Sequence, residues 1–150
     1  MDMSETILTK NTFKQSGFSR KKYRGSCHCG KVVFTVDALI DKIVSCNCSI
    51  CSKKGALHHR VNPSQFDLVS GEEDLVLYQF DTKEAKHYFC RNCGIHSFSY
   101  PRAAPDMVSI NVRCLENFSL EREGVQVISF DGRNWEKSLA KLNEELGSNK

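Results

Sequence analysis

The sequence predicts a single, mainly β domain that ends in one helix, and three observations support this prediction. Short runs rich in Val, Ile, Phe and Tyr recur between residues 31 and 112, and turn-forming residues separate them. The chain has 150 residues, of which 40% are hydrophobic and 26% charged, as is typical of one ordinary soluble domain. An apolar repeat with helical spacing occurs near the C-terminus.

The apolar runs predict an antiparallel all-β arrangement, because each run is short and bounded by turn signals. Turns are expected at residues 62–65, 70–74 and 101–106, which are rich in Pro, Gly, Ser, Asn and Asp. The predicted strands cover residues 31–36, 42–46, 56–61, 75–80, 86–90, 95–100 and 107–112.

The C-terminal helix is predicted in NWEKSLAKLNEEL, residues 134–146, where apolar residues recur at spacings of four, three and four. Asn134 is the expected N-cap, and Gly147 is expected to end the helix. Such a stripe usually faces the protein's own core, so we expect it to cover one sheet, with a partner-binding helix as the alternative. The stripe consists of Trp135, Leu139, Leu142 and Leu146.

The N-terminal residues differ in character from the rest of the chain. Residues 1–21 are polar, lack a sustained period and lead into the basic run SRKKYR, so we predict a flexible basic arm there and one folded domain over 22–147. The first residues carry acids and amides where a secretion signal needs a basic start and an apolar run, and no apolar stretch of about 18 residues occurs. We therefore expect no membrane partner and an intracellular, cytoplasmic protein, with the nucleus as the alternative compartment.

Cysteine usage is the strongest functional signal, because seven of the eight cysteines fall in three short clusters. A domain of this size does not need crosslinks, and clustered cysteines in a reducing compartment are more often metal ligands than disulfides. Thiolates at these spacings suit zinc, and Gly30 and Gly94, directly after two of the pairs, permit a tight turn around a metal. The clusters are Cys27 and Cys29, then Cys46, Cys48 and Cys51, then Cys90 and Cys93.

These seven cysteines divide into a closed and an incomplete ligand set. Two separated pairs form a four-cysteine structural zinc site that would tie the start of the β domain to its middle; they are Cys27, Cys29, Cys90 and Cys93. The other three form a set like that of catalytic zinc sites, which keep an exchangeable fourth position; they are Cys46, Cys48 and Cys51. The alternative is a second structural site closed by Cys114, His58 or His59. The two histidines are neighbours on a predicted strand, so at most one of them faces the metal.

This cysteine pattern resembles that of the glutathione-dependent formaldehyde-activating enzyme family, which also includes the domain of centromere protein V. The matching segments are GSCHCGKVVF, SCNCSICSKKGAL, YFCRNCGIHSF with the following YPR, and FDGRNW, so the resemblance covers residues 23–135. It implies a zinc-binding fold similar to that of Mss4, built from twisted antiparallel sheets. It also implies two zinc ions per chain, with the four-cysteine set structural and the three-cysteine set catalytic.

The resemblance further implies a carbon–sulfur lyase, since family members are described as adding glutathione reversibly to formaldehyde to give S-hydroxymethylglutathione. A small thiol such as glutathione and a small aldehyde are then the expected partners. Zinc deprotonates a coordinated thiol, so an open position would hold the substrate sulfur as the nucleophilic thiolate. Three cysteine thiolates leave the zinc site with a formal charge of −1, which weakens its action as a Lewis acid. We therefore favour thiolate delivery over polarisation of the aldehyde oxygen.

Basic side chains in the matching segments are candidate contacts for the carboxylates of a glutathione-like ligand. Lys53 and Lys54 follow the three-cysteine set, and Arg102 lies in the YPRAAP turn. Each is equally explained as a solvated surface charge. The sequence identifies no general acid or base and shows no partner for His28, His87 and His96.

The competing hypothesis is a non-enzymatic, zinc-stabilised binding module related to centromere protein V. In that case the zinc domain is a scaffold, and the basic N-terminal residues would contact chromatin or microtubules. The formal net charge of +3 is mild for a nucleic-acid binder, and few aromatic residues accompany the basic run, so no nucleic-acid partner is expected.

Overall fold

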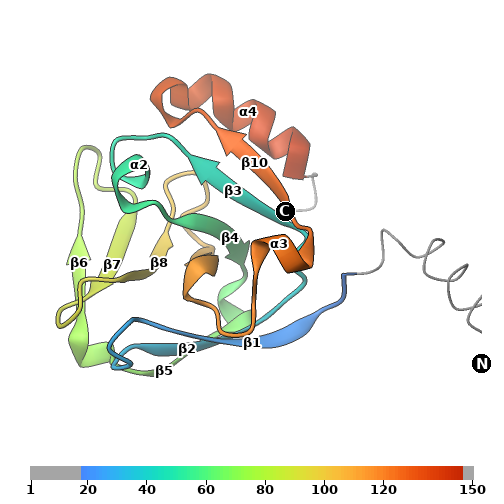
Figure 1. The fold of residues 1–150 in the computed structure, drawn as a ribbon. Helices are drawn as coiled ribbons and strands as arrows, with labels where there is room; N and C mark the ends of the chain where they lie inside the picture. Colours follow the sequence, from blue (N-terminus) through green and yellow to red (C-terminus); the bar gives the residue numbers. More distant parts are fainter. Residues whose placement is uncertain (1–17, 147–150) are drawn as a thin grey trace, which may run out of the picture.

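The computed structural model describes residues 18–146, and it confirms a mainly β fold with a C-terminal helix (Figure 1). The strands of this range are β1 (Lys21–Ser26), β2 (Val33–Ala38), β3 (Lys42–Cys46), β4 (Leu57–Val61), β5 (Phe66–Ser70), β6 (Leu75–Tyr78), β7 (Lys86–Cys90), β8 (His96–Tyr100), β9 (Val108–Asn111) and β10 (Gln126–Phe130). The helices are α2 (Cys51–Lys54), α3 (Leu120–Glu123) and α4 (Trp135–Leu146). Short 3₁₀ turns are η2 (Pro63–Gln65), η3 (Glu72–Asp74), η4 (Val112–Cys114) and η5 (Gly132–Asn134).

The strands form two sheets. A three-stranded sheet has the order β1-β2-β5, and a seven-stranded sheet has the order β10-β3-β4-β9-β8-β7-β6. All pairs are antiparallel except β10 with β3, where Gln126 lies opposite Lys42 and Phe130 opposite Cys46. The parallel pair departs from the predicted antiparallel arrangement. It arises because the chain returns through α3 to the end of the sheet where β3 begins, as the bond from the Gln126 N–H to the Asp41 carbonyl shows.

The main core lies between the two sheets. Phe34 and Val36 of β2 come from the small sheet, and Ile43 and Ile110 come from the large one; all four are at most 1% exposed. Aromatic rings extend this core, since Phe66 packs against both Phe34 and Phe98. Burying such side chains stabilises the fold by roughly 1.5–3 kcal/mol each.

A second apolar cluster places α4 on the edge of the large sheet (Figure 1). Leu142 is buried against Ile128 and Phe130 of β10, and Trp135 and Leu139 pack at the margin. The helix therefore covers a sheet, as its apolar stripe predicts. Asn134 does not act as the expected cap; its side-chain amide donates to Asp131, whose carboxylate accepts the Arg133 N–H of the preceding η5 turn. Gly147 lies outside the described residues.

Several strands were not predicted. In β1 the basic side chains are exposed while Tyr23 and Gly25 are buried. This alternation of exposed and buried residues was missed because the exposed positions form a run of basic residues. β5 and β10 each alternate weakly, with Asp67 and Ser129 exposed between apolar residues. The expected turns at 62–65 and 70–74 contain η2 and η3.

The predicted flexible arm falls mainly on residues 1–17, which lie outside the described residues, so the arm and the domain boundaries stay predictions. Within residues 18–146 no helix has the length and apolar character needed to cross a membrane.

Candidate metal centres and the adjoining cleft

The four predicted structural cysteines come together from two distant turns. The turn between β1 and β2 brings Cys27 and Cys29, the turn between β7 and β8 brings Cys90 and Cys93, and the four sulfurs lie within 4.8 Å of one another. Sγ of Cys29 lies 3.7 Å from Sγ of both Cys27 and Cys90. A tetrahedron of sulfurs around zinc at about 2.3 Å has edges of about 3.8 Å, so this set fits a closed zinc site.

Backbone geometry at both turns supports a metal at this position. Gly30 and Gly94 have φ of 86° and 80°, the left-handed region in which glycine is favoured. The Val32 N–H donates to the Cys27 sulfur and the Asn92 N–H to the Cys90 sulfur, each at 3.3 Å. Backbone N–H groups aimed at sulfur stabilise the thiolate form that zinc requires.

The other three clustered cysteines form a second, smaller group. Cys46 ends β3, Cys48 lies in the following loop and Cys51 begins α2, and their sulfurs lie within 4.8 Å of one another. The Cys48 N–H donates to the Cys46 sulfur and the Cys51 N–H to the Cys48 sulfur, each at 3.4 Å. Hydrogen bonds from the neighbouring thiols lower the pKa of Cys48, whereas bonds to Cys46 and Cys48 raise that of Cys51. Three thiolates this close repel one another, so a cation is needed to hold all three deprotonated.

None of the three residues considered as a fourth ligand completes this group among the described residues. The Cys114 thiol donates to the His96 carbonyl at 3.6 Å, and Nδ1 of His59 bonds the Lys42 carbonyl at 3.0 Å. His58 comes nearest, with Nε2 3.3 Å from Sγ of Cys51, but its nitrogen does not lie within 4.8 Å of all three sulfurs. Within residues 18–146, the set is thus three sulfurs with no fourth protein ligand.

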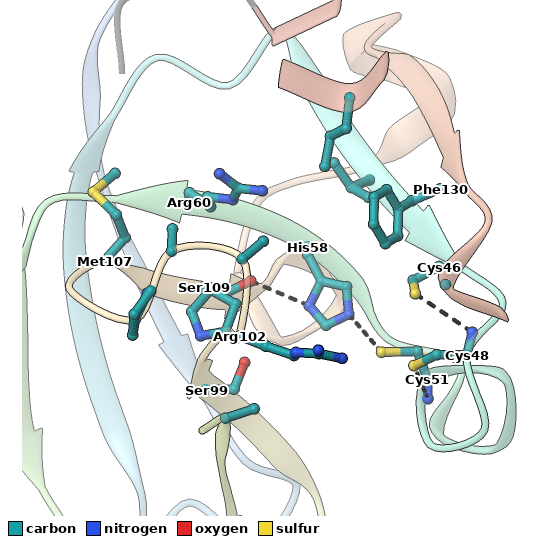
Figure 2. A pocket seen from close by; sticks show the side chains of 18 of the residues that line it. Cys46, Cys48, Cys51, His58, Arg60, Ser99, Arg102, Met107, Ser109 and Phe130 are labelled. Atoms are coloured by element: carbon teal, nitrogen blue, oxygen red, sulfur yellow. Dashed lines mark hydrogen bonds between the residues drawn. The ribbon is translucent and has the colours of Figure 1, made fainter. Parts of the chain in front are cut away.

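The three-cysteine group faces a cleft of about 1480 Å³ (Figure 2). All three of its cysteines line the cleft, and none of the four in the other cluster does. His58 and Arg60 project into it from β4, while Met107 lies at the end remote from the cysteines (Figure 2). The two groups therefore differ in ligand number and in access to the cleft, although Cys29 of the four-cysteine group is itself exposed on the surface.

The turn after β10 holds the three-cysteine loop in place. Asn47, inside the loop, donates to the Asp131 carboxylate at 3.0 Å, and Nε of Arg133 donates back to the Asn47 carbonyl at 2.9 Å. Gly132 sits between them without a side chain, against Cys46 and Cys48. The FDGRNW segment thus positions the candidate metal ligands through contacts that its own sequence does not reveal.

Lys54 is not the solvated surface charge that its sequence context allows. Its ammonium group lies 3.2 Å from Nδ1 of His87 and 3.2 Å from Nε2 of His96, and the side chain is half-buried. Burial lowers the pKa of Lys54, although the nearby cysteines act in the opposite direction. Lys53 is exposed, as expected of a surface lysine.

The histidines of this cluster are held neutral. Burial, followed by the charge of Lys54, lowers the pKa of His58 and His87 to about 4 and that of His96 to about 2. Sequence reasoning missed this convergence. The sequence did hold one signal for this cluster: a histidine stands inside each of two apolar strand segments, KHYF and IHSF. These segments flank the CxxC pair and belong to the paired strands β7 and β8.

Arg102 lines the cleft at a fixed position. Its guanidinium carbon lies 3.8 Å from the ring centre of Trp135, and its Nε lies 3.3 Å from Glu84. The side chain extends into the space between the loop that carries it and the cysteines (Figure 2). A guanidinium stacked on an aromatic face keeps its terminal N–H groups directed sideways, where they are available to a carboxylate.

Comparisons with known proteins agree with this geometry. Residues 22–128 match the family described as glutathione-dependent formaldehyde-activating enzyme. A crystal structure of a Rhodobacter sphaeroides protein, a Northeast Structural Genomics target, is similar with a TM-score of 0.64 and 38% sequence identity; the match covers 70% of this chain and 98% of that chain. The family match includes all seven clustered cysteines.

Proposed function

The chain belongs to the glutathione-dependent formaldehyde-activating enzyme family, and we propose that it is a zinc-dependent carbon–sulfur lyase that adds a glutathione-like thiol reversibly to a small aldehyde. The observation that carries this proposal is the position of the three-cysteine group on the wall of the cleft. A purely structural pair of zinc sites would give no reason for one of them to be incomplete and open to a space of ligand size.

The two cysteine groups would hold zinc in different roles. The four-cysteine group would hold a structural ion, which ties the β1–β2 turn to the β7–β8 turn. The three-cysteine group would hold a second ion, which when bound lowers the pKa of the incoming thiol and so supplies the thiolate nucleophile.

The cleft itself would bind and orient the thiol substrate. Its apolar wall includes Val44, Phe130 and Leu142, which exclude water from the reacting sulfur. Arg102, fixed on Trp135, would accept a substrate carboxylate and so hold the peptide part of a glutathione-like thiol. The sulfur would then lie at the cysteine end of the cleft.

Exchange spectroscopy tests this proposal. Glutathione and ¹³C-formaldehyde are brought to equilibrium with S-hydroxymethylglutathione, and the zinc-loaded protein is added at increasing concentration. We expect the interconversion rate to rise in proportion to protein concentration, and Cys48→Ser to abolish the increase while the four-cysteine zinc remains bound. An unchanged rate with both zinc ions present would contradict the lyase and favour the zinc-stabilised binding module.

A further inference from the structure

Lys54 is held in a pocket of nitrogen acceptors. Its ammonium lies 3.2 Å from Nδ1 of His87 and rests against the His96 ring, 3.2 Å from Nε2 and 3.3 Å from Nδ1, and no Asp or Glu of residues 18–146 pairs with it. A half-buried ammonium is costly unless it is hydrogen-bonded, so the two imidazoles are its partners. Both rings must present a bare nitrogen to it, because an ammonium can only donate.

These contacts determine the tautomers of both histidines. Nδ1 of His96 lies 2.9 Å from the Tyr88 carbonyl, which can only accept, so Nδ1 carries the proton and Nε2 is the bare nitrogen of that ring within reach of Lys54. Nδ1 of His87 accepts from Lys54 directly. The neutral ring of His87 therefore carries its proton on Nε2.

His87 stands between this cluster and the cleft. It lines the same cleft as the three cysteines, whereas Lys54 and His96 do not. Its ring is stacked on Phe80, with centroids 5.7 Å apart, which fixes its orientation. The Nε2–H of His87 has no acceptor among residues 18–146 and is left for a ligand in the cleft.

His58 is not available for the same task, although it lies closer to the sulfurs. Its Nε2 is 3.3 Å from the Cys51 sulfur and its Nδ1 is 3.3 Å from Oγ of Ser109. Both ring nitrogens are therefore engaged by the protein. Among the other histidines that line the cleft, His59 carries its proton on Nδ1, toward the Lys42 carbonyl, and so has none to donate from Nε2, which leaves His87 as the donor.

We propose, on the basis of the proposed lyase function, that His87 is the catalytic acid of the thiol–aldehyde addition and that Lys54 is the positioning residue that keeps its proton on Nε2. As the substrate sulfur forms its bond to the aldehyde carbon, the carbonyl π electrons move to oxygen. That oxygen takes the proton from Nε2 of His87, and Nδ1 takes one from the Lys54 ammonium; the resting state returns when Nδ1 gives its proton back to the Lys54 amine and solvent reprotonates Nε2. In the reverse direction Nε2 of His87 accepts the hydroxyl proton while its Nδ1 proton returns to the neutral Lys54 amine, and the carbon–sulfur bond breaks.

The tautomer is measurable without reference to catalysis. Long-range ¹H–¹⁵N spectra of the zinc-loaded full chain, ¹⁵N-labelled at histidine, should show His87 protonated on Nε2 at pH 7. Lys54→Met, which removes the ammonium and keeps the side-chain length, should give a mixture of both tautomers, and Lys54→Arg should restore the single form. A wild-type His87 protonated on Nδ1, or a tautomer unchanged in Lys54→Met, would overturn the positioning role.

The catalytic role is tested by rate. With both zinc ions retained, His87→Gln should lower the turnover of glutathione and formaldehyde about 100-fold and change KM for glutathione less than twofold. Lys54→Met should lower turnover about 10-fold, with recovery in Lys54→Arg. Lys86→Met, at an exposed lysine that does not line the cleft, serves as the matched control and should keep the wild-type rate.

The outcomes separate this inference from the proposed function. A wild type that catalyses the reaction while His87→Gln keeps more than a third of its rate would overturn the acid role alone. An inactive wild type with two bound zinc ions would overturn the lyase proposal, and with it the acid role. The tautomer of His87 would still decide whether Lys54 positions a donor toward the cleft.

Discussion

Gly132 packs directly against Cys48. A β-carbon placed on Gly132 would lie 2.7 Å from the Cβ of Cys48 and 2.8 Å from the sulfur of Cys46, closer than real β-carbons approach other atoms. The backbone of the turn after β10 therefore contacts the three-cysteine loop directly, with no room for a side chain between them. Only glycine allows the hydrogen bonds between Asn47 and this turn to form alongside that contact.

Gly132→Ala should consequently weaken metal binding at the three-cysteine group. The added methyl group pushes the loop outward, and we expect the zinc affinity of this site to fall about 10- to 100-fold, as for other changes in the surroundings of metal ligands. The four-cysteine site should keep its zinc. Competition with a chromogenic chelator, together with native mass spectrometry, would report both sites.

The control for this change is Gly124→Ala, a glycine with φ of 69° and open space around its α-carbon. It should lower stability by about 1 kcal/mol through backbone strain and leave both zinc affinities unchanged. Equal loss of zinc in both variants would show that general destabilisation, and not the contact with Cys48, governs the site.

Cys90→Ser and Cys48→Ser should have different consequences. Cys90 is fully buried in the four-cysteine group, so its replacement removes a proposed structural zinc ligand and should abolish cooperative thermal unfolding. Cys48→Ser should remove one zinc ion while circular dichroism still shows the β fold. Metal analysis and melting curves of the two variants check this. Similar unfolding in both would indicate two structural sites.

The sequence was sufficient to predict those strands and cysteine groups that local signals determine. Strands β3 and β7 occupy the predicted residues 42–46 and 86–90, and the spacing within each cysteine pair predicted which sulfurs come together. β10 was missed because its position depends on the chain crossing to the edge beside β3, and no local pattern encodes a parallel pairing. The bond network around Asn47 depends on that same crossing.

The environment of Lys54 was unpredictable for a related reason. Three elements, α2, β7 and β8, bring Lys54, His87 and His96 together, and they meet only through sheet pairing and the bulge between Tyr88 and Phe89. Because surface lysines are common, the sequence alone favours the ordinary explanation. The burial that shifts these pKa values is a property of the packed fold.

The buried histidine His96 predicts an acid-dependent stability. Burial lowers its pKa to about 2 in the folded state, whereas an unfolded histidine has a pKa of about 6.5. The unfolded state therefore binds an extra proton below pH 6.5, and stability contributed by neutral His96 is present above that pH and lost as pH falls toward the folded pKa. Between pH 7 and pH 5 the loss should be about 2 kcal/mol.

Denaturant unfolding of wild type and His96→Gln at both pH values would measure this loss. Glutamine does not titrate, so its stability should fall less on acidification, by about the same 2 kcal/mol. Zinc release is common to both proteins and cancels in the difference. A parallel decline of the two proteins would show that His96 is already protonated in the folded state.

Arg102→Ala should separate recognition of the substrate carboxylate from chemistry at sulfur. The guanidinium stacks on Trp135 and lines the cleft, so its loss removes a charge-assisted contact, and KM for glutathione should rise about 10-fold or more. With 2-mercaptoethanol, a thiol that lacks a carboxylate, the rate should stay within about twofold of wild type.

Trp135 is the sole tryptophan, so its fluorescence reports binding of S-methylglutathione without turnover. Arg91→Ala, at an exposed arginine bonded to the Glu73 carbonyl, is the control. An equal loss with both thiols would mean that Arg102 supports the cleft wall through Glu84 and Trp135 and does not contact the substrate.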